Sequence, residues 1–190
     1  MMNVRFIMLL LLTTTMLIIA ACARVTWMKV DEPNVISPDK TFSADVPVDW
    51  VQKVGETDKQ IYVTRDGPLI EFMELKRADH ADAFPELKKE SQPDMLGTEL
   101  AELVLAELRS DEVMENLEVI ENAPVDIAGK LGIVLHVKFR TEFGLQYERR
   151  VYAFVNQEGL YTLTYQAPSL HYFPLHADEF ERTVATFKLR

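Results

Sequence analysis

The residues most suited to metal binding form a short cluster, Asp79-His80-Ala81-Asp82. Two carboxylates and an imidazole can together hold a divalent cation. The cluster lies in the segment from Arg77 to Pro93, which lacks strong periodicity, and long connections of this kind often carry function. Aspartate, histidine and alanine are also ordinary residues of a solvated loop, and we favour that interpretation. We therefore expect neither a metal ion nor another cofactor.

The other histidines suggest structural roles. His136 lies on the even-numbered face of a strand-like segment, where we expect a half-exposed side chain. His171 and His176 are five positions apart, which would place their side chains about 140° apart on a helix. Pro174 lies between them and is expected to interrupt a helix. We expect both residues to line the loop that leads into the last helix.

The sequence offers little for nucleophilic catalysis. It contains no Gly-x-Ser-x-Gly motif and no glycine-rich phosphate loop. Its single cysteine, Cys22, lies near the start of the chain. An enzyme that uses His80, His171 or His176 for hydrolysis or metal-dependent chemistry is the alternative to a non-catalytic protein.

Two groups of residues are candidates for a partner surface. A basic group occurs on a predicted hairpin of an otherwise acidic chain and comprises Lys138, Arg140, Arg149 and Arg150. Its default role is ion pairing across strands on a solvated face, and contact with an anionic partner is the alternative. An aromatic group follows at the end of the last strand and in the next loop and comprises Tyr161, Tyr165, Tyr172 and Phe173. Tyrosines are enriched at binding surfaces as well as in cores, so this group is the first place to look for a partner.

Strand-like segments dominate the part of the chain that must position these residues. Alternation is clearest from Leu131 to Phe139, where the odd-numbered residues are apolar. Consecutive strands joined by short loops pair antiparallel. Strands are predicted at 41–46, 50–54, 60–65, 69–75, 131–139, 147–155 and 160–166.

Two helices are predicted to cover the sheet. Apolar residues at helical spacing indicate one helix from Thr98 to Arg109, with Thr98 as its N-cap. A C-terminal helix carries Phe180 and Phe187, with Asp178 as its N-cap. Each apolar stripe needs a sheet face to pack on. The expected fold class is therefore α+β, a central antiparallel β-sheet with helices packed on it.

Both ends of this region resemble a known family. The segment Phe42-Ser43-Ala44-Asp45-Val46-Pro47-Val48-Asp49-Trp50 resembles the opening strand and turn of PsbP-like domains. The segment from Gly159 to Ala167 and the closing helix up to Lys188 resemble the end of such domains, whereas residues 76–93 depart from the pattern. The resemblance implies an α/β/α sandwich and a family of mostly non-enzymatic binding or assembly proteins. It carries no metal-binding or partner-binding residue onto this chain.

The first 21 residues have the pattern of a signal peptide, in which Arg5 is followed by an apolar run and the small residues Ala20 and Ala21. The apolar run is shorter than the about 20 residues that a membrane-spanning helix needs. Ile19-Ala20-Ala21-Cys22 resembles the lipobox of bacterial lipoproteins. The resemblance implies cleavage between Ala21 and Cys22 and a diacylglycerol on Cys22. Two or more acyl chains, such as palmitate, make such an anchor durable.

The leader and the net charge indicate how the chain is divided and where it is located. We expect a signal peptide at 1–21, a lipidated tether at 22–40 and one PsbP-like domain at 41–190. The net charge of −10 becomes more negative when Arg5 leaves with the leader, and this disfavours binding to nucleic acid. Ala23 after the cysteine suggests the periplasmic side of the outer membrane, where the source has two membranes.

The expected function follows from the anchor, the resemblance and the missing catalytic motifs. We expect a membrane-anchored lipoprotein of the cell envelope, and a non-catalytic binding or accessory module for an envelope complex. Its protein partner is not identified by the sequence. An envelope hydrolase or metal-dependent enzyme is the alternative, and a carrier of a small apolar ligand is a third hypothesis.

Overall fold

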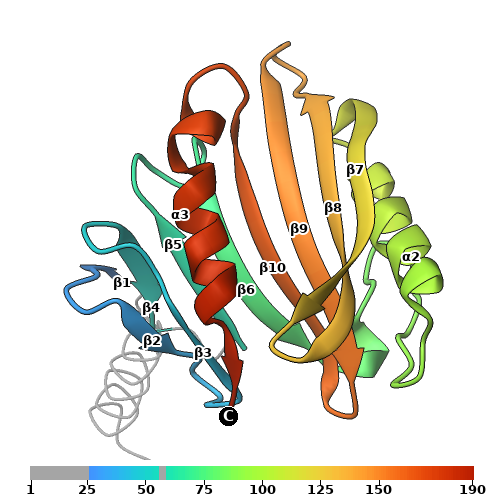
Figure 1. Ribbon diagram of the computed structural model, residues 1–190. Coiled ribbons are helices and arrows are strands. Elements are labelled where there is room, and N and C mark those ends of the chain that lie inside the picture. Colours follow the sequence, from blue (N-terminus) through green and yellow to red (C-terminus); the bar gives the residue numbers. More distant parts are fainter. Residues whose placement is uncertain (1–25, 56–58) are drawn as a thin grey trace, which may run out of the picture.

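The computed structural model describes residues 26–55 and 59–190 (Figure 1). The predicted signal peptide, its cleavage site after Ala21 and the predicted lipidation site Cys22 lie outside the described residues. Within the described ranges, no helix is both long enough and apolar enough to cross a membrane.

One large antiparallel sheet, the main sheet, forms the centre of the structure. Its strand order is β1-β4-β5-β6-β10-β9-β8-β7. The 3-10 helix η1 (His80–Asp82) follows β6. The strands are β1 (Thr26–Lys29), β4 (Val51–Val54), β5 (Gln60–Thr64), β6 (Phe72–Ala78), β7 (Glu115–Ile127), β8 (Lys130–Arg140), β9 (Gln146–Asn156) and β10 (Gly159–Pro168).

A small sheet and two helices complete the fold. The small sheet has the order β11-β3-β2 and comprises β2 (Asn34–Ile36), β3 (Phe42–Asp45) and β11 (Lys188–Leu189). Helix α3 (Tyr172–Thr186) packs on β9, β10 and β3. Helix α2 (Gly97–Ser110) packs on β7, β8 and β9, at the other end of the main sheet from β1 (Figure 1).

Alternation along the strands builds a separate core on each face. On β8, Leu135 and Val137 pack with Val104 of α2. Val134 points to the opposite face and joins the core that contains Phe180 of α3. The two helices therefore cover opposite faces of an antiparallel sheet. This arrangement confirms the predicted α+β fold class, a central antiparallel sheet with helices packed on it.

The domain begins earlier in the chain than predicted. Residues 26–40 were expected to belong to a tether, of which Trp27, Met28 and Val30 suggested that a part docks on the domain. In the structure, Thr26–Lys29 pairs with β4, and Asn34–Ile36 pairs with β3. Val30, which lies between these two strands in the sequence, is buried. These strands have only four and three residues, which is too short for alternation to reveal them. The described part of the predicted tether is therefore part of the domain.

The predicted strands are present, with shifts at their ends, but the sequence does not predict β7. This strand has 13 residues and lies at the edge of the main sheet. Most of its side chains are exposed, and two irregularities shift its register against β8. An exposed, bulged edge strand lacks the regular apolar alternation that marks a half-buried one.

Both predicted N-caps are wrong. Helix α2 begins at Gly97 after Leu96, and no side chain caps it. Helix α3 begins at Tyr172 after His171, so Asp178 lies inside the helix. Pro174 does not interrupt this helix because it lies in the first turn, where backbone N–H groups have no helical partner to lose.

Candidate functional site

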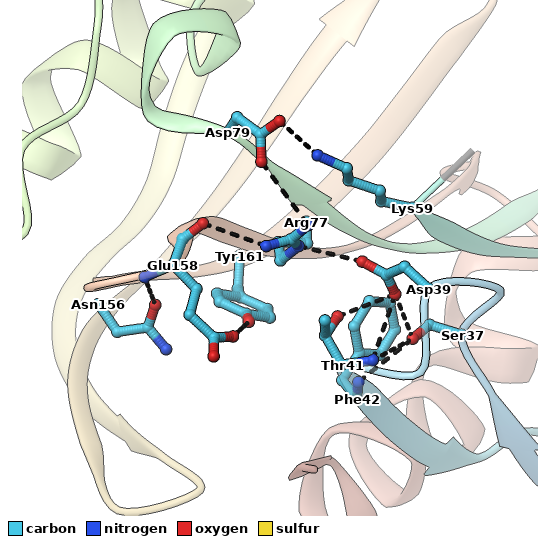
Figure 2. Close-up of polar contacts among 10 residues, drawn as sticks. All are labelled: Ser37, Asp39, Thr41, Phe42, Lys59, Arg77, Asp79, Asn156, Glu158 and Tyr161. Atoms are coloured by element: carbon cyan, nitrogen blue, oxygen red, sulfur yellow. Dashed lines mark hydrogen bonds and ion pairs between the residues drawn. The ribbon is translucent and has the colours of Figure 1, made fainter. Parts of the chain in front are cut away.

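Asp79 and Asp82 line a hollow of about 330 Å³ together with Lys59, Lys76 and Arg77. Lys59 forms an ion pair with Asp79, and the hydrogen bond that it donates is the main reason why the pKa of Asp79 is lowered (Figure 2). Three cations surround two carboxylates, so the hollow has the wrong charge to attract a metal ion. Over the described ranges, no three His, Cys, Asp or Glu side chains are grouped in a way that could hold a metal ion.

Arg77 holds three segments of the chain together, as Figure 2 shows. Its Nε donates to Asp39 Oδ2 at 3.1 Å, and its Nη1 donates to the Glu158 carbonyl at 3.3 Å. Burial would raise the pKa of Asp39, but hydrogen bonds from Ser37 and Thr41 and the charge of Arg77 outweigh it and lower that pKa. We call these five residues the Arg77 clasp. The clasp joins β6 to the loop before β3 and to the β9–β10 turn, which is a structural role.

The histidines of the enzymatic hypothesis do not come together. His80 follows the end of β6 that pairs with the start of β10, and its Nδ1 lies 2.6 Å from Ser91 Oγ. His171 lies just beyond the other end of β10. A ten-residue strand is about 33 Å long, so these two side chains cannot serve one site. His176 lies within α3 and is 3 % exposed, so the prediction that it lines a loop is wrong.

His176 belongs to a buried polar group between α3 and the main sheet. Arg65 Nη1 donates to its Nε2 at 3.0 Å, so Nδ1 carries the ring proton and donates to Glu71 Oε2 at 2.8 Å. Glu71 is completely buried, and burial together with the nearby carboxylate of Asp66 raises its pKa against the opposing effect of His176. The Trp50 ring packs edge-on against the imidazole at 5.5 Å. With both ring nitrogens bonded, His176 fixes α3 on the sheet and presents no nitrogen to a substrate.

His136 belongs to a second polar group under α3 and is buried rather than half-exposed. Its Nε2 lies 2.8 Å from Glu148 Oε2, and Phe173 stacks on its ring at 5.0 Å. Burial is the main cause of its lowered pKa, and the charge of Arg150 adds to this, against the effect of Glu148. Arg150 in turn pairs with Glu181 of α3 at 2.6 Å. This group also connects helix to sheet.

The aromatic group predicted as a partner surface is mostly core. Tyr161 and Tyr165 are completely buried, Phe173 is buried and Tyr172 is half-buried. Odd-numbered residues of β10 point toward α3, and Tyr165 stacks on Phe173 at 5.2 Å there. The prediction of an exposed aromatic surface at these four residues is therefore wrong.

The basic group does not form one surface either. Arg149 and Arg150 are adjacent on β9 and so point to opposite faces of the main sheet. Arg150 faces α3, as does Lys138, which lies opposite Glu148 on the neighbouring strand. Arg140, at the exposed end of β8, lies on the same face as Lys138 by the same alternation, so only Arg149 lies on the other face. A single contact surface made of all four cations is therefore wrong.

The face of the main sheet opposite α3 is only partly covered, because α2 lies at the β7 end (Figure 1). On β5 and β6 this face carries Tyr62 and Phe72, which are half-exposed and stack at 5.2 Å. Their neighbours Ile61 and Met73 point the other way into the α3 core. Trp27 of β1, 41 % exposed, extends the series and meets Tyr62 edge-on at 6.1 Å. We call Trp27, Tyr62 and Phe72 the aromatic row.

Polar side chains continue the same face beyond the aromatic row. Strand register places Glu74 opposite Tyr62, Gln166 opposite Phe72, and Arg149 opposite Gln166. Arg149 Nε donates to Gln166 Oε1 at 2.7 Å. Burial lowers the pKa of Arg149 to about 10, so it is still a cation at neutral pH. We call the aromatic row together with Glu74, Gln166 and Arg149 the open face.

The open face ends at a hollow of about 520 Å³ beside the C-terminal end of α2. Arg149 lines this hollow, which we call the acidic hollow. The carboxylate of Glu107 accepts hydrogen bonds from the backbone N–H groups of Glu86 and Leu87, which fixes the loop against the helix. Besides Arg149, the ionisable residues that line the acidic hollow are Glu86, Glu107, Asp111 and Glu112.

The sequence contains a partial signal for this site. Alternation in the predicted strands 60–65 and 69–75 shows that Tyr62 and Phe72 lie opposite to the buried residues of those strands. Only strand pairing brings Arg149, from a hairpin more than 70 residues further on, to the same face.

With this geometry established, the chain can be compared with known proteins. No protein-family model matches the sequence, and no curated protein does. Solved structures do share the fold. A mutant of protein Mog1 matches with a TM-score of 0.55 and 10 % identity, over 84 % of this chain and 96 % of that chain. At this identity the likeness shows the fold alone.

Two further structures match at lower scores. A protein from Bacteroides thetaiotaomicron has a TM-score of 0.49 and 15 % identity over 85 % of this chain. The match spans 49 % of that protein, about half its length. The cyanobacterial PsbP of Synechocystis has a TM-score of 0.42 and 11 % identity, over 90 % of this chain and 95 % of that chain. Scores of this size support no statement about function.

Proposed function

We propose that this chain is a lipoprotein of the cell envelope, acylated on Cys22, whose domain is a non-catalytic binding module. The open face is its proposed partner surface. The observation that carries the proposal is a partly exposed row of three aromatic rings that leads, on one sheet face, to an arginine at the rim of the acidic hollow.

The chemistry of the open face suits a protein partner. Tryptophan, tyrosine and arginine are the residue types that most often dominate the binding energy of protein interfaces. The acidic hollow places four carboxylates around one guanidinium and is net negative. Opposite charges on two partners speed and orient their association. The partner therefore presents a basic segment to the acidic hollow and apolar or flat side chains to the aromatic row.

A photo-crosslinking experiment in intact cells tests the partner surface. A photoreactive phenylalanine analogue at Phe72 should give an adduct with a second protein, because this ring lies in the middle of the open face. The same analogue at Phe143, an exposed residue on the β8–β9 turn, is the control and should not give that adduct. Identical adducts at both positions, or none at Phe72, would contradict the proposal.

A charge reversal tests the sign of the partner. Glu112→Lys at the exposed rim of the acidic hollow should reduce the Phe72 adduct, and more so at low salt. Glu142→Lys, at an exposed position near Phe143, changes the net charge equally and should leave the adduct unchanged. An adduct that increases with Glu112→Lys would show that the partner is anionic.

Mass spectrometry tests the anchor. The mature protein should begin at Cys22 and carry acyl chains, and Cys22→Ser should release it from membranes. A chain that begins at Met1, or a free thiol on protein that washes off membranes, would contradict the lipoprotein proposal.

A further inference from the structure

The domain begins very close to the proposed lipid anchor. Thr26, the first residue of β1, follows Cys22 by four residues. A fully extended chain advances at most about 3.6 Å per residue, so the two Cα atoms lie within about 14 Å of each other. This inference rests on the proposed acylation of Cys22. With so short a connection, the β1 edge cannot stand away from a bilayer that holds the acyl chains.

The β1 edge is apolar where it must meet the bilayer. All four residues of β1 are exposed, and among the described strands β1 is paired on one side only, with β4. Trp27 is 41 % exposed, and Met28 is 56 % exposed. Consecutive strand residues point to opposite faces, so both faces of the edge carry a large apolar side chain. The Trp27 ring has an apolar body and a polar N–H, a combination that prefers the interface between hydrocarbon and water.

Charged groups near the edge are compatible with a lipid headgroup layer. Lys53 lies opposite Trp27 on β4, and lysine can place its ammonium group among phosphates while its stem lies along apolar surface. Among the described residues, Asp31 and Glu32 follow the far end of β1, and Asp49 is paired there with Lys29 at 2.6 Å. The sequence from Cys22 to Val30 contains no acidic residue.

We propose that the β1 edge, through Trp27 and Met28, inserts into the headgroup layer of the membrane that holds Cys22. The occupant of this edge is a phospholipid surface rather than a second copy of the chain. A four-residue strand offers too few backbone groups and too little area for a stable dimer by edge pairing. The sheet then stands on its β1 edge, and the rest of the open face, from Tyr62 to Arg149, is held upright beside the bilayer.

The chain provides its own fluorescent probe and its own control. It has two tryptophans, Trp27 at the edge and Trp50, which is 1 % exposed. The acylated protein is reconstituted in phosphatidylcholine vesicles whose acyl chains are brominated near the headgroup. Trp27 emission should be quenched relative to unbrominated vesicles. Trp27→Phe keeps an apolar ring and should lose that quenching, because only the buried Trp50 then emits.

A second substitution tests docking without removing the probe. Met28→Glu should reduce the quenching of Trp27, because a carboxylate would have to enter the headgroup layer. Leu170→Glu is the matched control, since Leu170 is also exposed but lies in the β10–α3 loop, away from β1 (Figure 1). Equal quenching in wild type and Met28→Glu, or none in wild type, would overturn the inference.

The failure of the anchor can be told apart from the failure of the docking edge. Unacylated protein with residues 1–21 removed is coupled through the Cys22 thiol to a maleimide phospholipid in the same vesicles, which recreates the short connection. Quenching in this form supports the docking edge. If mass spectrometry then finds no acyl chain on the native protein, only the anchor proposal is overturned. Absence of quenching in this form overturns the docking edge and leaves the anchor intact. If sedimentation detects dimers and quenching is absent, the β1 edge binds a second copy of the chain, and membrane docking is overturned.

Discussion

The buried pair of Glu71 and His176 gives a strong test of how α3 is held on the main sheet. Glu71 is completely buried, His176 is 3 % exposed, and Nδ1 and Oε2 are 2.8 Å apart. His176→Leu would remove the hydrogen bond that the imidazole on α3 donates to the Glu71 carboxylate. Removing one partner of a buried pair costs about 3–5 kcal/mol, because the other group is left uncompensated in a poorly solvated site. A domain of ordinary stability has only about 5–15 kcal/mol in total.

The double variant should be much less destabilised than the single variants predict. In Glu71→Leu/His176→Leu, two apolar side chains replace the pair and no buried charge is left, and such replacements are often close to neutral. Arg65 loses its acceptor but is exposed, so its guanidinium can turn to water. The two substitutions should therefore be strongly non-additive, with a coupling of about 2–3 kcal/mol.

Equilibrium unfolding in urea, followed by tryptophan fluorescence and circular dichroism, measures these free energies. Asp49→Asn is the control, since it breaks the exposed ion pair with Lys29 and should leave the unfolding midpoint unchanged. The reasoning is refuted if His176→Leu is tolerated as well as Asp49→Asn, or if the two single effects add in the double variant.

Three further predictions concern packing elsewhere in the domain. Because the folded-state pKa of His136 is lowered, its contribution to stability is present above the unfolded value of about 6.5 and is lost as the pH falls through the folded value. His136→Gln should therefore reduce the loss of unfolding free energy between about pH 8 and about pH 5, and an unchanged pH profile would count against this assignment. Arg77→Met should lower the unfolding free energy by about 2 kcal/mol, because hydrogen bonds to charged groups contribute about 1.5–3 kcal/mol. The Arg77 side chain is only 14 % exposed, so water cannot readily replace these bonds. An unchanged urea midpoint would mean that the Arg77 clasp is dispensable. Gly132→Ala should lower the unfolding free energy by about 1–3 kcal/mol, because a Cβ would lie 2.4 Å from the Ala153 carbonyl oxygen. Gly97→Ala is the control and should keep the wild-type melting temperature, because its Cβ would lie 3.7 Å from the nearest atom.

The fold class and most strands were predictable because their signals are local. The segment from Leu131 to Phe139 shows its buried face by simple alternation, and the structure makes it β8. The helical spacing of apolar residues likewise predicts α2 and α3. Helix starts were less predictable, since neither α2 nor α3 uses a side-chain cap and Pro174 is tolerated in the first turn of α3.

The predicted site residues mostly failed because each was assessed by residue type and by neighbours in the sequence. Tyr161 and Tyr165 were candidates for a surface, but β10 lies in the middle of the main sheet with α3 over its odd-numbered face. Residues in a central strand under a helix are buried whatever their polar groups. Their hydroxyls are satisfied locally, as when Tyr165 donates to the Tyr172 carbonyl at 2.9 Å.

The sequence by itself determined features that depend on a few adjacent residues. These are the apolar run that precedes Cys22, the acidic composition, and the strands and helices whose apolar period is regular. What only the tertiary structure decided is which residues meet. Arg149 and Arg150 are adjacent in the chain yet lie on opposite faces. Glu71 and His176 are 105 residues apart, yet His176 donates a hydrogen bond to Glu71. The physical reason is that side chains alternate along a strand with a period of two, so the face of each residue depends on pairing register and helix placement, and both are set by contacts between distant segments.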